Sequence, residues 1–447
     1  MSFARYPEYR DSGVEWLGEV PAHWGVKRLK HNLRLLTEKT DRRTNPVALE
    51  NIESWSGRFV PTETEFQGEG VAFEANDILF GKLRPYLAKA LLATQAGEAV
   101  GDFHVMRPST HVLPRFAQYN ILNRSFIDIV DGSTFGSKMP RASWEFVGAM
   151  PLPTPPLPEQ TAIATFLDRE TAKIDALVAE QQKLITLLQE KRQAVISHAV
   201  TQGLDPSVPM KDSGVEWLGE VPGHWECIRL KQLVIESVAG PYGASLTKAM
   251  YASDGYRVYG QQQVIADDFS LGDYFISEKK YEEMRRYTVF EGDVLVSVMG
   301  TIGKVAVVPP DAPPGIINPR LVRYRCGDLI QSRYLQSVLM CQKHQEHLLL
   351  ESNGTTMDGL NMVTLGRVPI PIPPIDEQTQ ILRYLKDQAQ EFDPLISEAE
   401  SAITLLQERR TALISAAVTG QIDVRGLLVG TSCTPDSVAA CACPVMA

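Results

Sequence analysis

The chain has 447 residues, is 44% hydrophobic and carries a formal net charge of −10. This length exceeds that of a typical single domain, so we expect several domains, each with its own core. No run approaches the roughly 18 apolar residues of a membrane helix, and the first residues lack the apolar core of a signal peptide, so we expect a soluble cytoplasmic protein.

The chain starts with a segment that occurs a second time. Residues 11–24 are DSGVEWLGEVPAHW and residues 212–225 are DSGVEWLGEVPGHW, identical at 13 of 14 positions with an offset of 201. We therefore place repeated leaders at residues 1–25 and 206–226. A repeated segment of this kind indicates two related modules in one chain.

A variable block follows each leader, at residues 26–158 and 227–375. Short apolar strands alternate in both blocks with turns that contain Gly and Pro, which predicts mixed α/β domains. The segment NDILFGKLRPYLAKALLA (76–93) resembles GDVLVSVMGTIGKVAVV (292–308). We interpret the blocks as divergent copies of one fold.

A long amphipathic helix is predicted after each block, within residues 159–205 and 376–425. The segments at 186–205 and 404–423 match at 13 of 20 positions with an offset of 218, so the second block carries a net insertion of 17 residues.

Apolar residues recur at heptad spacing in both helices, which is typical of a coiled coil. In the first helix the two lines of the seam are Leu167, Ile174, Gln181, Leu188 and Val195, and Ile163, Leu177 and Leu184. In the second helix the seam is Leu385, Phe392, Ala399, Leu406 and Leu413. We expect antiparallel pairing, with Pro394 re-capping or kinking the second helix because proline disrupts a helix interior.

The predicted fold class is α/β plus long α-helices. Two mixed α/β domains are joined by two long antiparallel coiled-coil helices in a pseudo-twofold internal repeat, and residues 426–447 form a disordered tail. The acidity lies in the repeated scaffold. Residues 26–150 hold 16 basic and 14 acidic side chains, and residues 227–368 hold 15 of each, so the variable blocks permit DNA binding by local patches.

Several segments together carry a family resemblance. They are the leader GVEWLGEVPxHW, the segment DILFGKLRPYLAK (77–89), the loop Gly354-Thr-Thr before PIPPIDEQ, and the paired helices. From about residue 5 to residue 425 the chain resembles the specificity subunit of a Type I restriction–modification system.

The resemblance implies two target recognition domains, each of which recognises one half of a bipartite, asymmetric site in double-stranded DNA. The helices would set the spacer and dock two adenine-N6 methyltransferase subunits, and through them two ATP-dependent restriction subunits. The chain itself would be a non-catalytic subunit without a cofactor.

The chain lacks the motifs of the enzymes that act on nucleotides or DNA, in agreement with that implication. No GxxxxGK[ST] loop is present to bind a nucleotide. The FQGEG segment at 66–70 mimics an S-adenosylmethionine motif, but no Asn/Asp-Pro-Pro-aromatic segment follows it. The six cysteines form no CxxC pair and the eight histidines form no HExxH motif, so we expect no metal site.

Candidate DNA contacts follow from residue chemistry, because Arg and Lys donate to phosphates and to guanine, while Gln pairs with adenine. In the first domain the candidates are Lys82, Arg84, Tyr86, Lys89, Lys138 and Arg141. In the second domain they are Gln261, Gln262, Gln263, Lys304, Arg320, Thr355 and Thr356. Two alternatives stay open: the Arg84-Pro85 pair as a buried structural turn, and the glutamine run as a solvated loop.

Two other functions also stay open at this stage. One is an enzyme, either a fused restriction–methylation polypeptide or a lone methyltransferase, which the missing motifs disfavour. The other is an adaptor with two dissimilar protein-binding heads on a coiled coil. Binding to DNA that weakens steeply with salt would separate DNA recognition from the adaptor.

Overall fold

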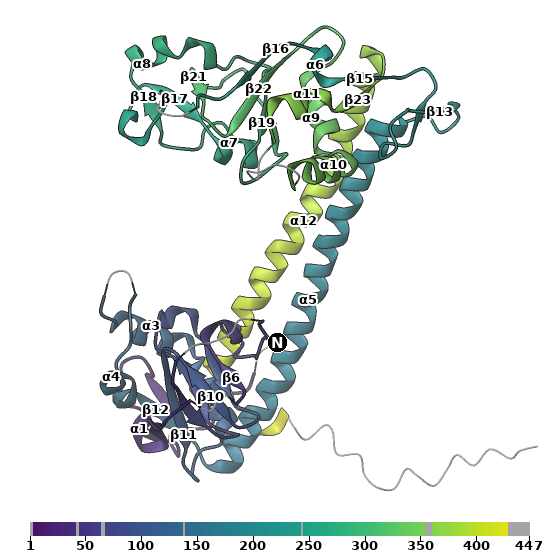
Figure 1. Cartoon of the computed structure of the whole chain (residues 1–447). Helices are drawn as coiled ribbons and strands as arrows, with labels where there is room; N and C mark the ends of the chain where they lie inside the picture. Colours follow the sequence, from purple (N-terminus) through teal and green to yellow (C-terminus); the bar gives the residue numbers. More distant parts are fainter. Residues whose placement is uncertain are drawn as a thin grey trace, which may run out of the picture. The chain divides into compact units, whose positions relative to one another are not determined.

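The structure is a computed structural model. It describes residues 3–41, 44–63, 68–136, 139–242, 245–353 and 360–427. The chain divides into unit 1, residues 1–182 with 401–447, and unit 2, residues 183–400. Each unit contains one α/β domain and one part of each of two long helices (Figure 1). Among the helices of the described ranges, none combines the length and the hydropathy that a membrane-spanning segment requires.

The α/β domain of unit 1 is built on two four-stranded sheets. The first has the antiparallel order β4 (Leu33–Leu36), β11 (Phe103–Pro108), β8 (Ile78–Gly81), β9 (Ala90–Leu92). The second has the order β5 (Lys39–Thr40), β7 (Gly70–Phe73), β10 (Gly97–Val100), β6 (Pro46–Val47), in which only β10 and β6 are parallel. The helices of the domain are α1 (Leu29–Asn32), α2 (Pro114–Ile121), α3 (Arg124–Gly132) and α4 (Trp144–Ala149). The side chains of β8 and of α2 to α4 form its main core.

The α/β domain of unit 2 repeats this arrangement. Its antiparallel sheet has the order β16 (Val234–Ala239), β22 (Leu321–Cys326), β19 (Val294–Ser297), β20 (Val305–Val307). Its second sheet has the order β18 (Phe275–Ile276), β17 (Tyr256–Tyr259), β21 (Gly315–Ile317), with β17 and β21 parallel. The helices are α6 (Leu230–Leu233), α7 (Gln261–Ala266), α8 (Glu278–Glu283), α9 (Ser332–Met340), α10 (Gln342–Asn353) and α11 (Met362–Arg367). The antiparallel sheets have the same strand order, which supports the interpretation of the two blocks as divergent copies of one fold, whereas the second sheets differ, with four strands in unit 1 and three in unit 2.

Each leader forms a two-stranded hairpin, β1 (Tyr9–Asp11) with β2 (Glu19–Pro21), and β13 (Met210–Asp212) with β14 (Glu220–Pro222). Two further strand pairs close the domains, β3 (Gly25–Arg28) with β12 (Pro151–Thr154), and β15 (Glu226–Arg229) with β23 (Pro369–Ile372). The Trp24 indole donates to the Glu159 carboxylate at 2.9 Å, and the Trp225 indole donates to Glu377 at 3.0 Å. Each leader is thereby fixed to the first turns of a long helix in its own unit.

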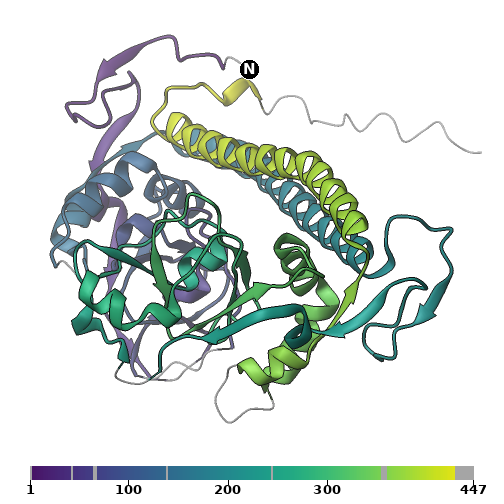
Figure 2. The same ribbon diagram turned by 90° about the horizontal axis from the view of Figure 1, so that it is seen from above.

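The two long helices are α5 (Leu157–Gln202) and α12 (Ile375–Val418). In each unit an early part of one helix packs against a late part of the other, so the pairing is antiparallel, and the segments lie side by side in both views (Figures 1 and 2). Arg410 donates to Asp175 at 2.9 Å in unit 1, and Arg192 pairs with Asp393 at 3.0 Å in unit 2. Arg410 lies 218 positions after Arg192, and Asp393 lies 218 positions after Asp175. The same ion pair therefore occurs twice, and the helix that supplies the arginine in one unit supplies the aspartate in the other.

The expected seam of α5 is only partly correct. Leu167 and Ile174 are buried, but Leu177 and Leu184 are 44% and 42% exposed. Ile185 is buried instead, because the stripe of buried and half-buried residues follows positions 167, 171, 174, 178, 181 and 185, with alternating steps of four and three. A helix that packs against one partner buries a narrow stripe and leaves other apolar residues exposed.

Of the two expectations for Pro394, the re-capping is wrong, because α12 is a single helix through this residue. Proline removes one backbone hydrogen bond of a helix. The neighbouring residues hold the helix in place: the Phe392 ring is buried under the Lys191 ammonium, and Asp393 pairs with Arg192.

A buried histidine in α10 makes the stability of unit 2 depend on pH. His344 Nδ1 lies 3.2 Å from the Cys341 thiol, and its Nε2 lies 3.0 Å from the Pro369 carbonyl oxygen. This arrangement fits a neutral ring that accepts from the thiol and donates to the carbonyl. Burial lowers the pKa of His344 to about 4.

We expect unit 2 to lose stability as the pH falls from 7 to 5. The unfolded imidazole titrates near pH 6.5 and the folded one does not until about pH 4, so this stabilisation is complete above pH 6.5 and decreases below it, by about 2 kcal/mol at pH 5. Hydrogen-exchange protection factors of α9 and α10 would measure the loss. The variant His344→Asn should lack this component, and an identical pH profile in the variant would contradict the assignment.

Candidate nucleic-acid interface

Each domain contains a buried aspartate directly before an equivalent strand, β8 in unit 1 and β19 in unit 2. In unit 1 both oxygens of Asp77 accept from the Arg107 guanidinium at 2.8 Å, and Asp77 also accepts from the Glu74 backbone N–H at 2.7 Å. In unit 2 Asp293 accepts from the Phe290 backbone N–H at 2.9 Å and from Arg325 at 2.9 and 3.1 Å. The two domains therefore share a common frame, by which we mean the antiparallel sheet together with its buried aspartate–arginine pair.

On this frame, unit 1 presents a basic cluster around Asp102, the residue before β11. Arg141 donates from Nε at 3.1 Å and from Nη2 at 2.8 Å to the Asp102 carboxylate, which raises the pKa of the Arg141 guanidinium. The Lys82 ammonium lies 3.7 Å from the same carboxylate. Backbone hydrogen bonds join the segments, from Lys82 N to Asp102 O and from Ala142 N to Lys82 O, both at 2.9 Å. Lys82 and Arg141 are thus brought together with one acidic partner.

The turn at Arg84 has features of both interpretations made from the sequence. Pro85 is buried and Arg84 adopts a left-handed backbone with φ of 52°, so the turn is structural. The Arg84 side chain and the Tyr86 side chain are nevertheless exposed. By contrast, the Lys89 ammonium donates to the Leu49 carbonyl oxygen at 2.6 Å, so this lysine is used inside the domain.

In unit 2 the corresponding cluster is centred on Gln261. Its side-chain nitrogen donates to Ser297 Oγ at 2.9 Å, to Thr301 Oγ1 at 2.7 Å and to the Met299 carbonyl oxygen. Its side-chain oxygen accepts from Arg320 Nη1 at 3.0 Å. The Arg320 side chain is exposed. Gln261 therefore connects the loop after β19 to the guanidinium of Arg320.

The three consecutive glutamines have different environments, because neighbouring residues of a helix point in different directions. Gln263 is 3% exposed, and its amide accepts from Gly260 N at 2.8 Å and donates to the Leu271 carbonyl oxygen at 2.8 Å. Its role is therefore structural. Gln262 is exposed. Lys304 is half-buried, and its ammonium has no hydrogen-bond or ion-pair partner within the described ranges. The candidates Lys138, Thr355 and Thr356 lie outside the described residues.

Two residues near these clusters, Asp102 and Phe135, were not among the candidates taken from the sequence. Asp102 and Arg320 occupy equivalent positions, since Lys82 N donates to the Asp102 carbonyl and Val298 N donates to the Arg320 carbonyl at 2.9 and 3.0 Å. The offset of 218 could have identified Asp102. The second is Phe135, which is 81% exposed and whose carbonyl oxygen accepts from Arg141 N at 3.4 Å; the sequence offered no signal for it.

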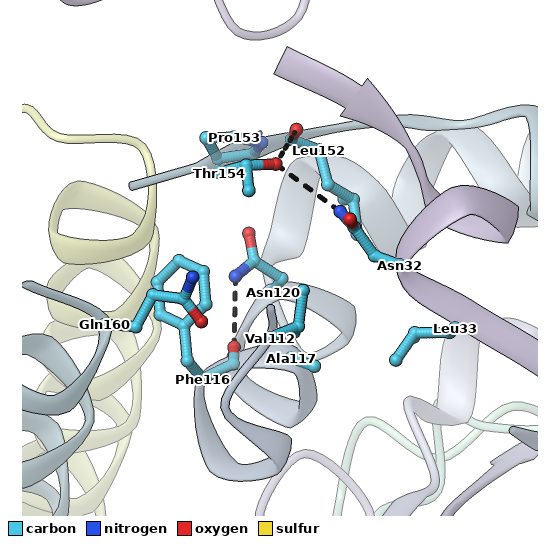
Figure 3. A pocket seen from close by; sticks show the side chains of 10 residues that line it. All are labelled: Asn32, Leu33, Val112, Phe116, Ala117, Asn120, Leu152, Pro153, Thr154 and Gln160. Carbon is cyan, nitrogen blue, oxygen red and sulfur yellow. Dashed lines mark hydrogen bonds between the residues drawn. The ribbon is translucent and has the colours of Figure 1, made fainter. Parts of the chain in front are cut away.

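A small pocket in unit 1 lies where α2 and β12 meet the start of α5 (Figure 3). Its volume is about 10 Å³, which is enough for a single water molecule. Its polar groups bond within the protein: Asn120 donates to the Phe116 carbonyl at 3.0 Å, and Gln160 accepts from Leu113 N at 2.8 Å. A pocket of this volume is too small to bind a substrate. The described ranges also contain no cluster of three or more His, Cys, Asp or Glu residues that could hold a metal ion.

Comparisons with known proteins find similarity to specificity subunits of type I restriction enzymes. The family model "Type I restriction modification DNA specificity domain" matches residues 222–401. The type I restriction enzyme MjaVIII specificity subunit of Methanocaldococcus jannaschii is 22% identical over 317 residues, which are 68% of this chain and 69% of the relative. The putative MjaX specificity subunit of the same organism is 22% identical over 437 residues, 92% of this chain and 96% of the relative. The EcoBI specificity subunit of Escherichia coli is 24% identical over 281 residues, 61% of this chain and 58% of the relative.

One similar solved structure comes from work on complex assembly and conformational transition of the type I R-M system. It is 19% identical, with a TM-score of 0.67, and the match covers 89% of this chain and 98% of that chain. This likeness confirms the predicted fold class of α/β domains with long helices.

Proposed function

We propose that this chain, a member of the type I restriction–modification specificity subunit family, directs a methylation and restriction complex to a bipartite, asymmetric DNA site. A specificity subunit is non-catalytic and contains a DNA-recognition domain. In this proposal the target recognition domains are residues 26–158 and 227–375, and each recognises one half of the site.

One observation carries the proposal: two domains with the same frame present different polar groups at equivalent positions. The residue before the central strand is Asp102 in unit 1 and Arg320 in unit 2. Lys82 corresponds to the apolar, buried Val298, since each backbone N–H makes the same hydrogen bond. A shared frame would orient both domains alike on a duplex, while the different side chains would select different bases.

Within the described ranges the proposed contact residues are those whose side chains are at least partly exposed, while Lys138, Thr355 and Thr356 are proposed from residue type alone. In the first domain they are Lys82, Arg84, Tyr86 and Arg141, together with Lys138. In the second domain they are Gln262, Lys304 and Arg320, together with Thr355 and Thr356. Lys89, Gln261 and Gln263 support the domains instead, because their polar atoms bond internally.

The helical regions 159–205 and 376–425 would set the spacer and bind the partner subunits. The 46 residues of α5 correspond to about 69 Å of helix at 1.5 Å per residue. Leu177, Leu184 and Leu187 are exposed on α5, and Leu405 is 64% exposed on α12. Exposed apolar residues of this kind favour protein contacts. We assign them to two adenine-N6 methyltransferase subunits, through which two ATP-dependent restriction subunits join the complex.

Exchange of one recognition domain tests the proposal. Residues 26–150 would be replaced by the equivalent domain of another specificity subunit. The chain would be co-expressed with its methyltransferase subunit, and the methylated adenines would be sequenced genome-wide. We expect the unaltered chain to give one bipartite motif with a fixed gap, and the exchange to change one half only. A change in both halves would contradict recognition by two independent domains.

The adaptor function predicts a different result. An adaptor would assemble with partners and yet show no affinity for DNA. For DNA recognition, the logarithm of the binding constant should fall with the logarithm of salt concentration, with a slope of about −0.9 per phosphate contacted. A complex that assembles, gives no methylation and binds no DNA would favour the adaptor.

A further inference from the structure

In unit 1 the structure leaves one edge of a fixed guanidinium open. Arg141 uses its Nε and Nη2 hydrogens to hold the Asp102 carboxylate, at 3.1 and 2.8 Å. The opposite edge, formed by Nη1 and the second Nη2 hydrogen, makes no hydrogen bond in the described ranges, and the side chain is 51% exposed. Arginine therefore presents two parallel donors from a side chain that is already immobilised.

Unit 2 contains an equivalent arrangement, in which a glutamine side chain in place of a carboxylate holds the arginine. Arg320 Nη1 donates to the Gln261 side-chain oxygen at 3.0 Å, and its Nε and Nη2 edge makes no hydrogen bond in the part of the chain that the structure describes. Gln261 is itself fixed, because its nitrogen donates to Ser297 and Thr301. Each domain thus holds one arginine through an anchored acceptor and leaves one bidentate edge open.

We propose that Arg141 and Arg320 each recognise the guanine of a G·C pair in the major groove, one in each half of the site. Guanine presents O6 and N7 as adjacent acceptors, and a pair of parallel guanidinium donors matches them. The proposal rests on the proposed function and deepens it, since it names one base pair in each half-site. Asp102 and Gln261 are positioning residues that act through the arginines.

Immobilisation is the feature that favours a base over a phosphate. Phosphate contacts position a protein and do not need a defined orientation of the guanidinium. A flexible cation is adequate for them, and Arg84, which has no side-chain partner in the described ranges, fits that role. A guanidinium held before binding loses less side-chain freedom when it meets its base.

The test uses the complex of the full chain with its methyltransferase subunits and a duplex that contains the methylated motif. Each guanine of the motif is replaced in turn by 7-deazaguanine, which lacks the N7 acceptor. We expect one guanine in each half whose replacement weakens binding by about 5- to 150-fold. Arg141→Lys should abolish the sensitivity in the first half only, and Arg320→Lys in the second half only. Both variants keep the charge.

Further variants separate positioning from phosphate binding. Asp102→Asn and Gln261→Ala should each reduce the preference for G·C in one half and leave the other half unchanged, which a general loss of folding would not do. Arg84→Lys is the matched control, because it should leave the sensitivity to 7-deazaguanine intact. Half-sites without a G·C pair, or lysine variants that weaken binding equally for every sequence, would overturn the proposal while the bipartite motif stands. Absence of a bipartite motif would overturn the proposed function itself.

Discussion

Replacing Asp293 with alanine is expected to lower the stability of unit 2 by about 3–5 kcal/mol, the cost of breaking a buried ion pair from one side. The Asp293 carboxylate is 1% exposed, and the Arg323 guanidinium that donates to it at 3.0 Å is 2% exposed. Arg325 and the Phe290 backbone N–H also donate to it. The variant leaves a buried guanidinium without its buried counter-ion, since the other carboxylate on Arg323, that of Glu236, is 42% exposed.

The equivalent substitution in unit 1 is the matched control. Asp77 likewise accepts from a backbone N–H three residues earlier, that of Glu74, and pairs with Arg107. The Arg107 side chain, however, is 33% exposed and also pairs with the Glu74 carboxylate. Water and Glu74 can take over part of the lost interaction, so we expect Asp77→Ala to cost about 1–2 kcal/mol. Hydrogen exchange in β19 and β22, compared with β8 and β11, reports on the units separately, which a single unfolding transition would not. Equal losses in both units would show that burial of Arg323 does not set the cost.

The sequence was sufficient to predict the repeated fold, because its signals are local and duplicated. Two nearly identical leaders and two matched helices define the modules without any knowledge of packing. The seam of α5 was harder to predict, because the helix carries leucines on more than one side. Leu177 and Ile174 both fit a heptad, and only the position of α12 decides that Ile174 is buried and Leu177 exposed.

The candidate site was predictable in its residue types but not in the roles of individual atoms. Gln261 and Gln263 have the chemistry of adenine recognition, and the structure shows their amides engaged inside the domain. Asp102 has the wrong charge for a DNA contact, and only the tertiary structure shows that it holds Arg141. Sequence identifies a donor, but the partners that immobilise it come from segments distant in the chain.

A second large effect is expected where the end of α12 meets the first leader. Gly420 has φ of +78°, and a Cβ placed on it would lie 2.4 Å from Pro21 Cδ and 3.1 Å from Trp24 Cη2. Gly203, at the end of α5, has the same φ, but its Cβ would lie 3.4 Å from both Pro222 and Trp225. The two glycines share the same backbone strain and differ in the space around them.

Gly420→Ala should therefore destabilise unit 1 by about 2–5 kcal/mol, of which roughly 1–2 comes from the left-handed backbone and about 1–3 from overpacking. Gly203→Ala should destabilise unit 2 only by the roughly 1–2 kcal/mol that the left-handed backbone costs. Exchange protection of β1, β2 and the last turn of α12 would measure the first effect. Because Tyr9 donates its hydroxyl to the Gly420 carbonyl at 2.9 Å and Asp423 N donates to the Ala4 carbonyl at 2.8 Å, a displaced Gly420 also frees the first residues of the chain. Equal costs for both substitutions would mean that Pro21 and Trp24 yield freely, and that the leader does not fix the end of α12.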